Sequence, residues 1–313
     1  MARRRRRRNV GPEAVIGPAV SRLSRTRTGR RVLAVLAVVL LLAFAGQWLW
    51  DNHLRPRHPV GPAVRVATWN LRHFSERPGV DLHAIAEVIR ASSFDVVAVQ
   101  EVKKDGRQVD ALLNVLGSPW RATSLSDTTG NRERFVYLYH GDHVQEVREA
   151  GGARFAASPQ AGVFARTPYQ ATFRAGQFDF TLVTVHLSFE DRDRRRRETD
   201  SLPALARDVA GASAEKDVIV LGDFNAQSPR DLQPLESAGL RVLSRAATNL
   251  GSTEAYDTLV IDPAPTREWN GRAGAVNFDD ILPQYKDDAE ARRRVSDHRP
   301  AYADFVTNLP DDD

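Results

Sequence analysis

The chain has 313 residues, of which 42% are hydrophobic, and it contains no cysteine, which excludes disulfides, thiolate metal sites and cysteine nucleophiles. The net charge of +4 conceals an asymmetry, because residues 1–50 hold eleven arginines and one acidic residue, whereas residues 51–313 hold 33 basic and 39 acidic residues. The basic character therefore belongs to the N-terminal end. The rest of the chain carries a net charge of −6, which gives no overall basic surface for nucleic acid.

The first sixty residues have the pattern of a membrane-targeting region. Residues 1–31 are basic and predict a disordered cytoplasmic leader. Residues 32–50, VLAVLAVVLLLAFAGQWLW, are uncharged and close to the roughly 20 residues that span a bilayer as a helix. The preceding arginines predict a single-pass plasma-membrane protein with an extracytoplasmic main domain, joined through a proline-rich linker, 51–63. Two alternatives stay open: a twin-arginine signal at Arg30-Arg31, and cleavage near Ala45 that would release a secreted form.

The remaining chain has the pattern of one domain, predicted over residues 64–307 and followed by an acidic tail, 308–313. Short apolar runs predict buried strands, and apolar residues three and four apart predict helices. The predicted strands cover residues 64–70, 94–100, 134–140, 161–166, 178–187, 218–221, 255–261 and 300–306. The predicted helices cover 82–89, 109–116 and 199–212, with Pro203 placed in the first turn of the last. Residues 192–197, RDRRRR, are expected to form a loop that is solvated or adds phosphate contacts.

Polar side chains gather where several of these strands end. In residues 217–227, DVIVLGDFNAQ, a buried strand runs into Asp223 and Asn225, whose side chains point to the same side because extended chain alternates with a period of two. Charged groups are costly to bury unless they are paired or bind metal, so this strand end predicts a cation or phosphate site. Turn chemistry would explain one such residue but not the whole set: Asn70, Glu101, Glu133, His186, Asp223, Asn225, Asp257, Asp297 and His298.

These residues are carboxylates, carboxamides and two histidines. Oxygen ligands suit hard cations, so we expect Mg²⁺ or Mn²⁺, with Ca²⁺ as an alternative structural ion. A hard cation beside histidines fits hydrolysis of a phosphate ester by an activated water, because the metal neutralises phosphate oxygens while an acid and a base handle the two protons. A carboxylate partner would orient each imidazole and favour its charged form.

Seven segments resemble motifs of the endonuclease/exonuclease/phosphatase superfamily, in that family's order, and within it the chain looks most like deoxyribonuclease I. The segments are WNLRHF, VVAVQEV, RERFVYLYH, FTLVTVHL, VIVLGDFNA, AYDTLVI and SDHRP, and the resemblance covers residues 64–307. It implies an α/β (α+β) fold, a four-layer sandwich of two mixed β-sheets packed face to face with helices outside. The predicted transmembrane helix would precede this domain.

The resemblance also implies roles for the matched residues. His298, oriented by Asp257, would be the base that activates water. His186, paired with Glu133, would protonate the leaving oxygen. The division of acid and base between the two histidines stays open at this point.

The same resemblance implies a metal and phosphate site. Glu101 and Asn70 would belong to the metal site, with Glu101 as a direct ligand, and Asp297 would complete it. Asp223 and Asn225 would hold the scissile phosphate.

Three basic residues near these motifs, Arg72, Lys103 and Arg166, are expected to bind DNA phosphates, or else to be solvated surface charges. The leading hypothesis is a Mg²⁺- or Mn²⁺-dependent endonuclease of low sequence specificity that cuts DNA outside the membrane, with no obligate protein partner. Two alternatives stay open: a hydrolase of the same superfamily acting on phospholipid, sphingomyelin or a soluble phosphate ester, and an inactive membrane-anchored binding module.

Overall fold

The computed structural model describes residues 62–251, 253–285 and 287–310, together with Arg31, Val35 and Val39, which are helical. The predicted leader, transmembrane helix and linker therefore lie almost entirely outside the described residues, as do the last three residues of the acidic tail. Within the described part of the chain, no helix is both long and apolar enough to cross a membrane.

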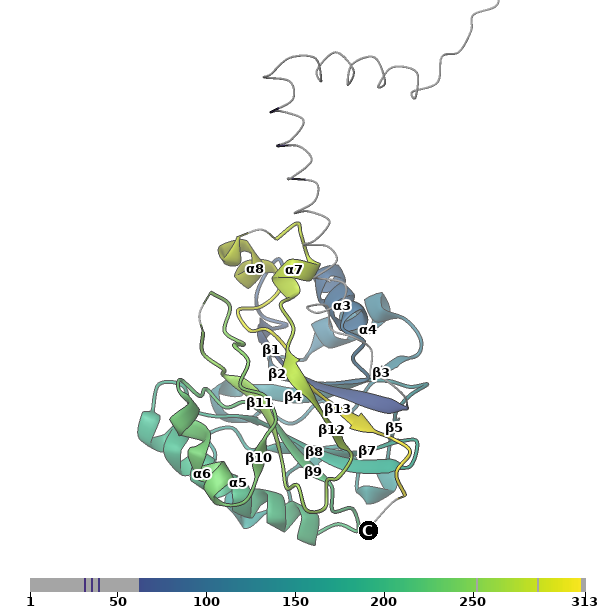
Figure 1. Ribbon diagram of the computed structural model, residues 1–313, viewed down its shortest axis with the longest axis vertical. Coiled ribbons are helices and arrows are strands. Elements are labelled where there is room, and N and C mark those ends of the chain that lie inside the picture. The colour runs from purple at the N-terminus through teal and green to yellow at the C-terminus, as the bar shows by residue number, and fades with distance from the viewer. Residues whose placement is uncertain are drawn as a thin grey trace, which may run out of the picture. The chain divides into compact units, whose positions relative to one another are not determined.

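Two mixed β-sheets form the centre of the domain (Figure 1). The first sheet runs in the order β12 (Trp269–Ala275), β13 (Ala301–Val306), β1 (Ala63–Phe74), β2 (Val96–Val102), β4 (Arg134–His140) and β3 (Trp120–Ala122). The second runs β10 (Arg241–Val242), β11 (Asp257–Ile261), β9 (Val218–Asp223), β8 (Phe178–His186), β7 (Tyr169–Ala175) and β5 (Gln145–Glu146), with β6 (Arg154–Phe155) also paired to β7. Each sheet contains one parallel pair, β1 with β2 and β8 with β9, among antiparallel neighbours, which confirms the predicted mixed sheets.

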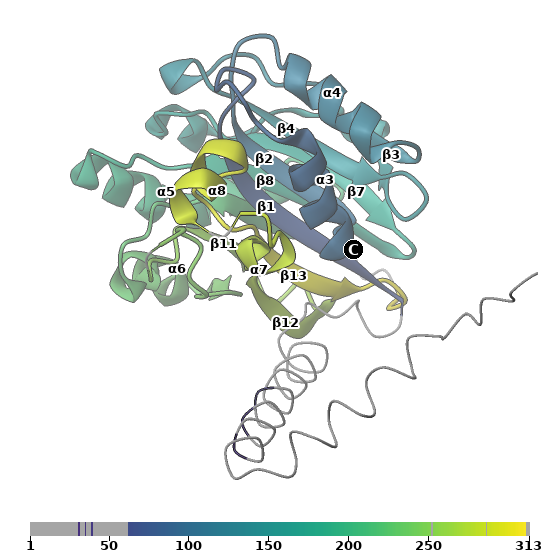
Figure 2. The same cartoon turned by 90° about the horizontal axis from the view of Figure 1, so that it is seen from above.

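The two sheets pack face to face, and helices cover both outer faces (Figures 1 and 2). Apolar residues of β1, β2, β4 and β13 meet those of β7, β8, β9 and β11 in a core between the sheets. The helices α3 (Leu82–Ala91) and α4 (Arg107–Leu116) share a second core with the first sheet, and α5 (Arg192–Gly211) and α6 (Gln233–Ser237) share a third with the second sheet. Two short helices, α7 (Phe278–Ile281) and α8 (Asp288–Arg294), precede β13. This is the predicted four-layer sandwich.

One predicted strand is wrong. Residues 161–166 do not form a strand, because the 3₁₀ helix η4 (Pro159–Val163) occupies the first half of this segment and bends occupy the rest. The Ser158 side chain accepts a 3.0 Å hydrogen bond from the Gln160 amide, and Pro159 begins the helix. A capping serine followed by proline is a helix start signal, and it outweighs the apolar content of the residues that follow.

The arginine-rich segment is also not a loop. Helix α5 begins at Arg192, seven residues before the predicted start, because Asp191 caps it by accepting a 2.8 Å hydrogen bond from the Arg194 amide. Pro203 consequently lies inside the helix and not in its first turn. Among the described residues, the remaining 3₁₀ helices are η2 (Gly130–Arg132), η3 (Arg148–Ala150) and η5 (Pro229–Leu232).

Strand register brings the polar strand ends together. His186 on β8 lies beside Asp223 on the parallel strand β9, and Asp257 on β11 lies on the other side of Asp223. Gly222 makes this close pairing possible, because its φ is 145° and a side chain there would meet the Val185 carbonyl oxygen at 2.0 Å. Three site residues therefore occupy one row across three neighbouring strands.

Candidate active site

Asp223, at the C-terminal end of β9, lies at the centre of the polar cluster. Its Oδ2 atom is 3.5 Å from Nε2 of His186 and 3.8 Å from Nε2 of His298. The same oxygen accepts a 3.0 Å hydrogen bond from the Asn70 side-chain amide. Asp223 is buried, and these neighbours compensate the loss of its hydration.

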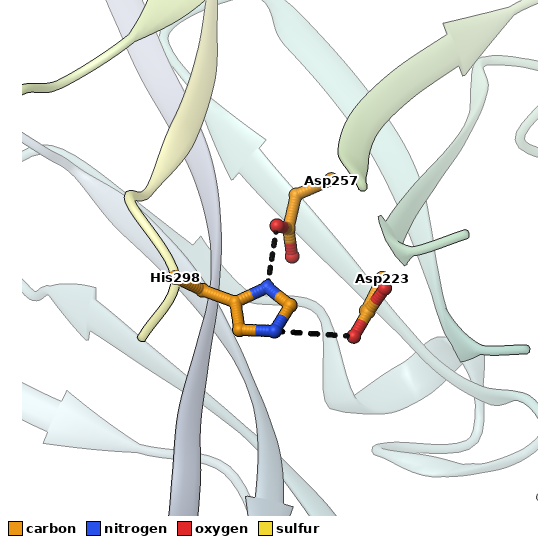
Figure 3. A group of neighbouring side chains, drawn as sticks. All are labelled: Asp223, Asp257 and His298. Atoms are coloured by element: carbon orange, nitrogen blue, oxygen red, sulfur yellow. Dashed lines mark hydrogen bonds and ion pairs between the residues drawn. The ribbon is translucent and has the colours of Figure 1, made fainter. Parts of the chain in front are cut away.

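His298 is held in place by Asp257, as Figure 3 shows. Its Nδ1 atom is 2.8 Å from the Asp257 carboxylate, so the Nδ1 hydrogen is donated there and Nε2 faces Asp223. Burial alone would lower the pKa of His298, but the charges of Asp257 and Asp223 raise it above its ordinary value. The backbone is fixed as well, since Trp69 Nε1 donates to the His298 carbonyl at 2.8 Å and the His298 amide donates to the Ser296 hydroxyl at 3.1 Å.

His186, at the end of β8, has a matching partner on the other sheet. Its Nδ1 atom is 2.8 Å from Oε2 of Glu133, which lies immediately before β4. Burial alone would lower the pKa of His186, but the hydrogen bond to Glu133 and the charge of Asp223 raise it. Each histidine thus has one nitrogen bound to a carboxylate and the other directed at Asp223.

Glu133 also forms ion pairs with two basic side chains. Lys103 Nζ lies 3.2 Å from Oε1 of Glu133, and Arg166 Nε lies 2.8 Å from its Oε2. Asn131 donates a further hydrogen bond to Oε1 at 3.2 Å. Burial alone would raise the pKa of Glu133, but His186 and Arg166 hold it well below its ordinary value. Lys103 and Arg166, which the sequence suggested as phosphate ligands, are thus engaged with Glu133, and Lys103 is only 5% exposed.

Asn70 and Glu101 extend the cluster onto the first sheet. The Asn70 amide nitrogen donates to Oε1 of Glu101 at 2.9 Å as well as to Asp223, so two carboxylates meet at one donor. Oε2 of Glu101 accepts a 2.9 Å hydrogen bond from the His73 amide. Glu101 has a φ of 60°, a left-handed conformation that is uncommon outside glycine and that occurs often at functional sites.

The donor atoms fit a hard divalent cation. One ligand atom each from Asp223, Asp257 and His298 lie within 4.8 Å of one another, and Oδ1 of Asp257 is buried with no hydrogen-bond partner in the described part of the chain. Glu101 adds a carboxylate on the far side of the Asn70 amide. Two buried carboxylates, Asp223 and Asp257, with the partly buried Glu101 nearby, favour a cation between them.

The other predicted site residues surround this group. Asn225 has a φ of 51°, and its amide nitrogen donates to Leu187 O at 2.8 Å, while its backbone amide donates to Oδ1 of Asp223 at 2.8 Å. Asp297 does not bond to the central carboxylates but pairs with Arg72 at 3.1 Å. The Arg72 side chain is 39% exposed, which makes it the most exposed of the three basic residues expected to bind phosphate.

Sequence reasoning assigned no role to several residues that fix or flank the site. Ser296 donates a 2.6 Å hydrogen bond to the Asn70 carbonyl and so links β1 to the His298 segment. The ring of Tyr256 lies 5.8 Å from that of His298 and 6.2 Å from that of Phe189, which is 51% exposed. Ser296 and Tyr256 lie inside the recognised motifs, but no spacing rule predicts their contacts.

The fold and this site together define a metal-dependent phosphoester hydrolase. Residues 67–298 match the model of the Endonuclease/Exonuclease/phosphatase family, and the chain belongs to that family.

A protein from Thioalkalivibrio sp. named "Deoxyribonuclease" is 33% identical over 276 residues, which cover 78% of this chain and 72% of that protein. The human endonuclease/exonuclease/phosphatase family domain-containing protein 1 is 24% identical over 79% of this chain, which spans half of the human protein's length. Rabbit deoxyribonuclease-1 is 25% identical over 53% of this chain and 62% of its own length.

Solved structures share the fold. An endonuclease/exonuclease/phosphatase family protein from Bacteroides thetaiotaomicron superposes with a TM-score of 0.58 at 17% identity, over 80% of this chain and all of that one. Truncated Caenorhabditis elegans TDP2 gives 0.57 at 15% identity, over 78% of this chain and 97% of that one.

Proposed function

We propose that the chain is a divalent-metal-dependent endonuclease that cuts DNA with little sequence preference, using Mg²⁺ or Mn²⁺. The observation that carries this proposal is the arrangement of two histidine–carboxylate pairs, His186–Glu133 and His298–Asp257, on either side of Asp223. The relative named "Deoxyribonuclease" supports DNA as the substrate.

In this mechanism the two histidines divide the proton transfers. Water attacks phosphorus and gives a proton to Nε2 of His298, while Asp257 keeps the ring oriented. Because Asp257 and Asp223 raise the pKa of His298, the ring must first release its own proton. The phosphorus–oxygen bond to the leaving group breaks, and that oxygen takes a proton from Nε2 of His186, whose pKa is raised by the hydrogen bond to Glu133 and the charge of Asp223. A bound divalent cation would neutralise charge on the non-bridging phosphate oxygens. Asn225 and Arg72 would help to hold the phosphate.

We further propose that residues 32–50 anchor the protein in the plasma membrane, with its N-terminus in the cytoplasm and the hydrolase domain outside. The support is the uncharged apolar sequence of this segment and the arginines that precede it. Membrane fractionation with protease protection of intact cells tests the orientation. External protease should remove the domain, and a protected domain would contradict the proposal.

Nicking of supercoiled plasmid by the purified full-length chain tests the nuclease activity. Cleavage is expected with Mg²⁺ or Mn²⁺, and it should stop with EDTA or with His298→Ala. Conversion of circular plasmid separates endonuclease from exonuclease action, since a closed circle has no ends. An intact plasmid after incubation with the parent chain and either metal would refute DNA cleavage.

A second candidate keeps the chemistry but changes the substrate to a phospholipid, sphingomyelin or a soluble phosphate ester. It is favoured by the net charge of −6 beyond residue 50, which does not attract DNA, and by an apolar segment that would keep the domain near lipid. Comparing kcat/KM for plasmid, sphingomyelin vesicles and sugar phosphates at one enzyme concentration separates the two candidates.

A further inference from the structure

A pocket of about 560 Å³ lies between the start of α5 and the 3₁₀ helix η5, outside the active-site cluster. Its charged lining consists of Arg192, Arg195, Arg196, Arg230, Asp193 and Asp231. Guanidinium groups therefore outnumber carboxylates by four to two. The domain has a net negative charge, so this local excess of positive charge runs against its overall balance.

Three of the four arginines are available to a ligand. Arg192, Arg196 and Arg230 are exposed, and none of their side chains makes a hydrogen bond or an ion pair with another described residue. Arg195 is different, because it is buried and donates to the carbonyls of Ser188 and Phe189 at 3.0 and 2.6 Å.

The two acidic residues are fewer than the arginines, so the pocket keeps a net positive charge. The Asp231 carboxylate already accepts hydrogen bonds from the amides of Gln227 and Ser228, at 2.9 and 3.0 Å. Asp193 is a single exposed residue in the first turn of α5.

The arginines also occupy positions that do not favour the helix. Positive side chains near a helix N-terminus are destabilising, because the macrodipole is positive at that end. Four of the first five residues of α5 are nevertheless arginine. Residues that break a local rule of this kind are expected where they serve a function, and an anion bound in the pocket would relieve the repulsion.

Both walls of the pocket continue directly from the active site. Helix α5 begins six residues after His186, and Ser228 follows Asn225 by three residues. Three residues of extended chain reach at most about 11 Å. One strand of B-DNA advances about 3.4 Å per nucleotide, so the rim of the pocket lies within a few nucleotides of Asn225.

We propose that this pocket binds a non-scissile phosphate of a polynucleotide whose cleaved phosphate lies at Asp223 and Asn225. The inference rests on the proposed nuclease function and deepens it, because a second phosphate site favours a polymer over a substrate with a single phosphate group. The contacts would be electrostatic and directed at the backbone, so they would carry no sequence preference.

The test compares the full-length parent with two triple variants of equal net charge. The pocket variant carries Arg192→Ala, Arg196→Ala and Arg230→Ala. The control carries Arg121→Ala, Arg207→Ala and Arg241→Ala, three exposed arginines that do not line the pocket. kcat/KM is measured for a duplex of about 30 base pairs over a range of NaCl concentrations, and for the small diester bis(4-nitrophenyl) phosphate, since salt dependence reports phosphate contacts.

The pocket variant should lose more than tenfold in kcat/KM for the duplex at low salt. The slope of log(kcat/KM) against log[NaCl] should become shallower by about 1 for each phosphate that the protein no longer binds. Its turnover of the small diester should equal that of the control. Duplex slopes that match between the two variants would overturn the proposal. An equal loss on the small diester would also overturn it, because the arginines would then support the catalytic centre. If the parent cleaved only the small diester, the nuclease proposal would fail, and duplex binding measured by fluorescence anisotropy would still decide the role of the pocket.

Discussion

The imidazoles of His186 and His298 approach the same atom, Oδ2 of Asp223, with their Nε2 nitrogens at 3.5 and 3.8 Å. The orientation of each ring is fixed by a carboxylate that lies 2.8 Å from its Nδ1 atom. The two nitrogens that can exchange protons therefore face one small volume from two different strand ends. Displacement at phosphorus needs one proton acceptor and one proton donor, and these two nitrogens are the groups to which the proposed mechanism gives those roles.

Lys103→Met should lower kcat more than it changes KM, because Lys103 is buried against Glu133 and orients the His186 partner. The salt dependence of duplex cleavage should stay at the parental value, since a residue that touches no phosphate contributes nothing to the slope. Arg72→Ala serves as the contrast, and its exposed side chain predicts a higher KM and a shallower slope. A shallower salt-dependence slope for Lys103→Met would contradict this prediction and indicate that Lys103 binds a DNA phosphate directly.

The loss of cleavage rate caused by His186→Ala should depend on the leaving group of the substrate. If His186 protonates the leaving oxygen, its loss costs about 10²–10⁴-fold for DNA, whose leaving group is an alkoxide. The loss should be much smaller for bis(4-nitrophenyl) phosphate, because 4-nitrophenolate leaves without a proton. Equal losses on both substrates would remove the acid role from His186. Rates for His298→Ala on the same two substrates provide the comparison, since a base is needed for either.

Glu133→Gln should destabilise the domain in a pH-dependent way. The folded pKa of Glu133 lies below its ordinary value of 4.5, so its contribution to stability is present above about pH 4.5 and is lost as the pH falls towards the folded value. At pH 7 the variant leaves Lys103 and Arg166 without their buried partner, which costs about 3 kcal/mol or more. Urea unfolding at pH 7 and pH 3.5 should show a smaller difference from the parent at the lower pH. A difference that grows on acidification would contradict this assignment.

Gly222→Ala should be among the most destabilising single substitutions in the domain. Its φ of 145° and the 2.0 Å approach to the Val185 carbonyl leave no room for a methyl group beside β8, so we expect a loss of about 3 kcal/mol or more. Gly211→Ala is the matched control, because a side chain there meets nothing within 4 Å and the residue closes helix α5. It should leave urea unfolding unchanged or shift the midpoint upward.

Much of the sandwich could be predicted because its central strands are continuous apolar runs that end in polar residues. The strand 134–140 agrees with β4, and the long strand ending near His186 agrees with β8 to within one residue. Two longer strands were missed. β7, YQATFRA, alternates between apolar and polar residues as a strand does, so the sequence did contain its signal. β12 carries small residues and Gly271 with a φ of 86°, and it exists through its pairing with β13 and not through its own pattern.

Strand ends named the site residues, and the family resemblance named two of their contacts, His186 with Glu133 and His298 with Asp257, which the structure contains. Register within the second sheet sets His186, Asp223 and Asp257 in one row, and no single strand pattern contains that information. Lys103 and Arg166 were expected to bind phosphate because they lie near the matched motifs, whereas their burial against Glu133 is a long-range pairing that the sequence does not reveal. The sequence therefore indicated the chemistry of the site and its two histidine–carboxylate pairs, and it missed the ion pairs that Glu133 makes with Lys103 and Arg166.

Single-turnover cleavage of a DNA duplex with Mg²⁺ by the parent, His186→Ala, His298→Ala and the double variant tests the account most directly. In the proposed mechanism both histidines act in one reaction at one phosphate, so each single variant should lose at least about 10²-fold, and the double variant should lose less than the product of the two. Parental rates in either single variant would contradict a shared site at Asp223.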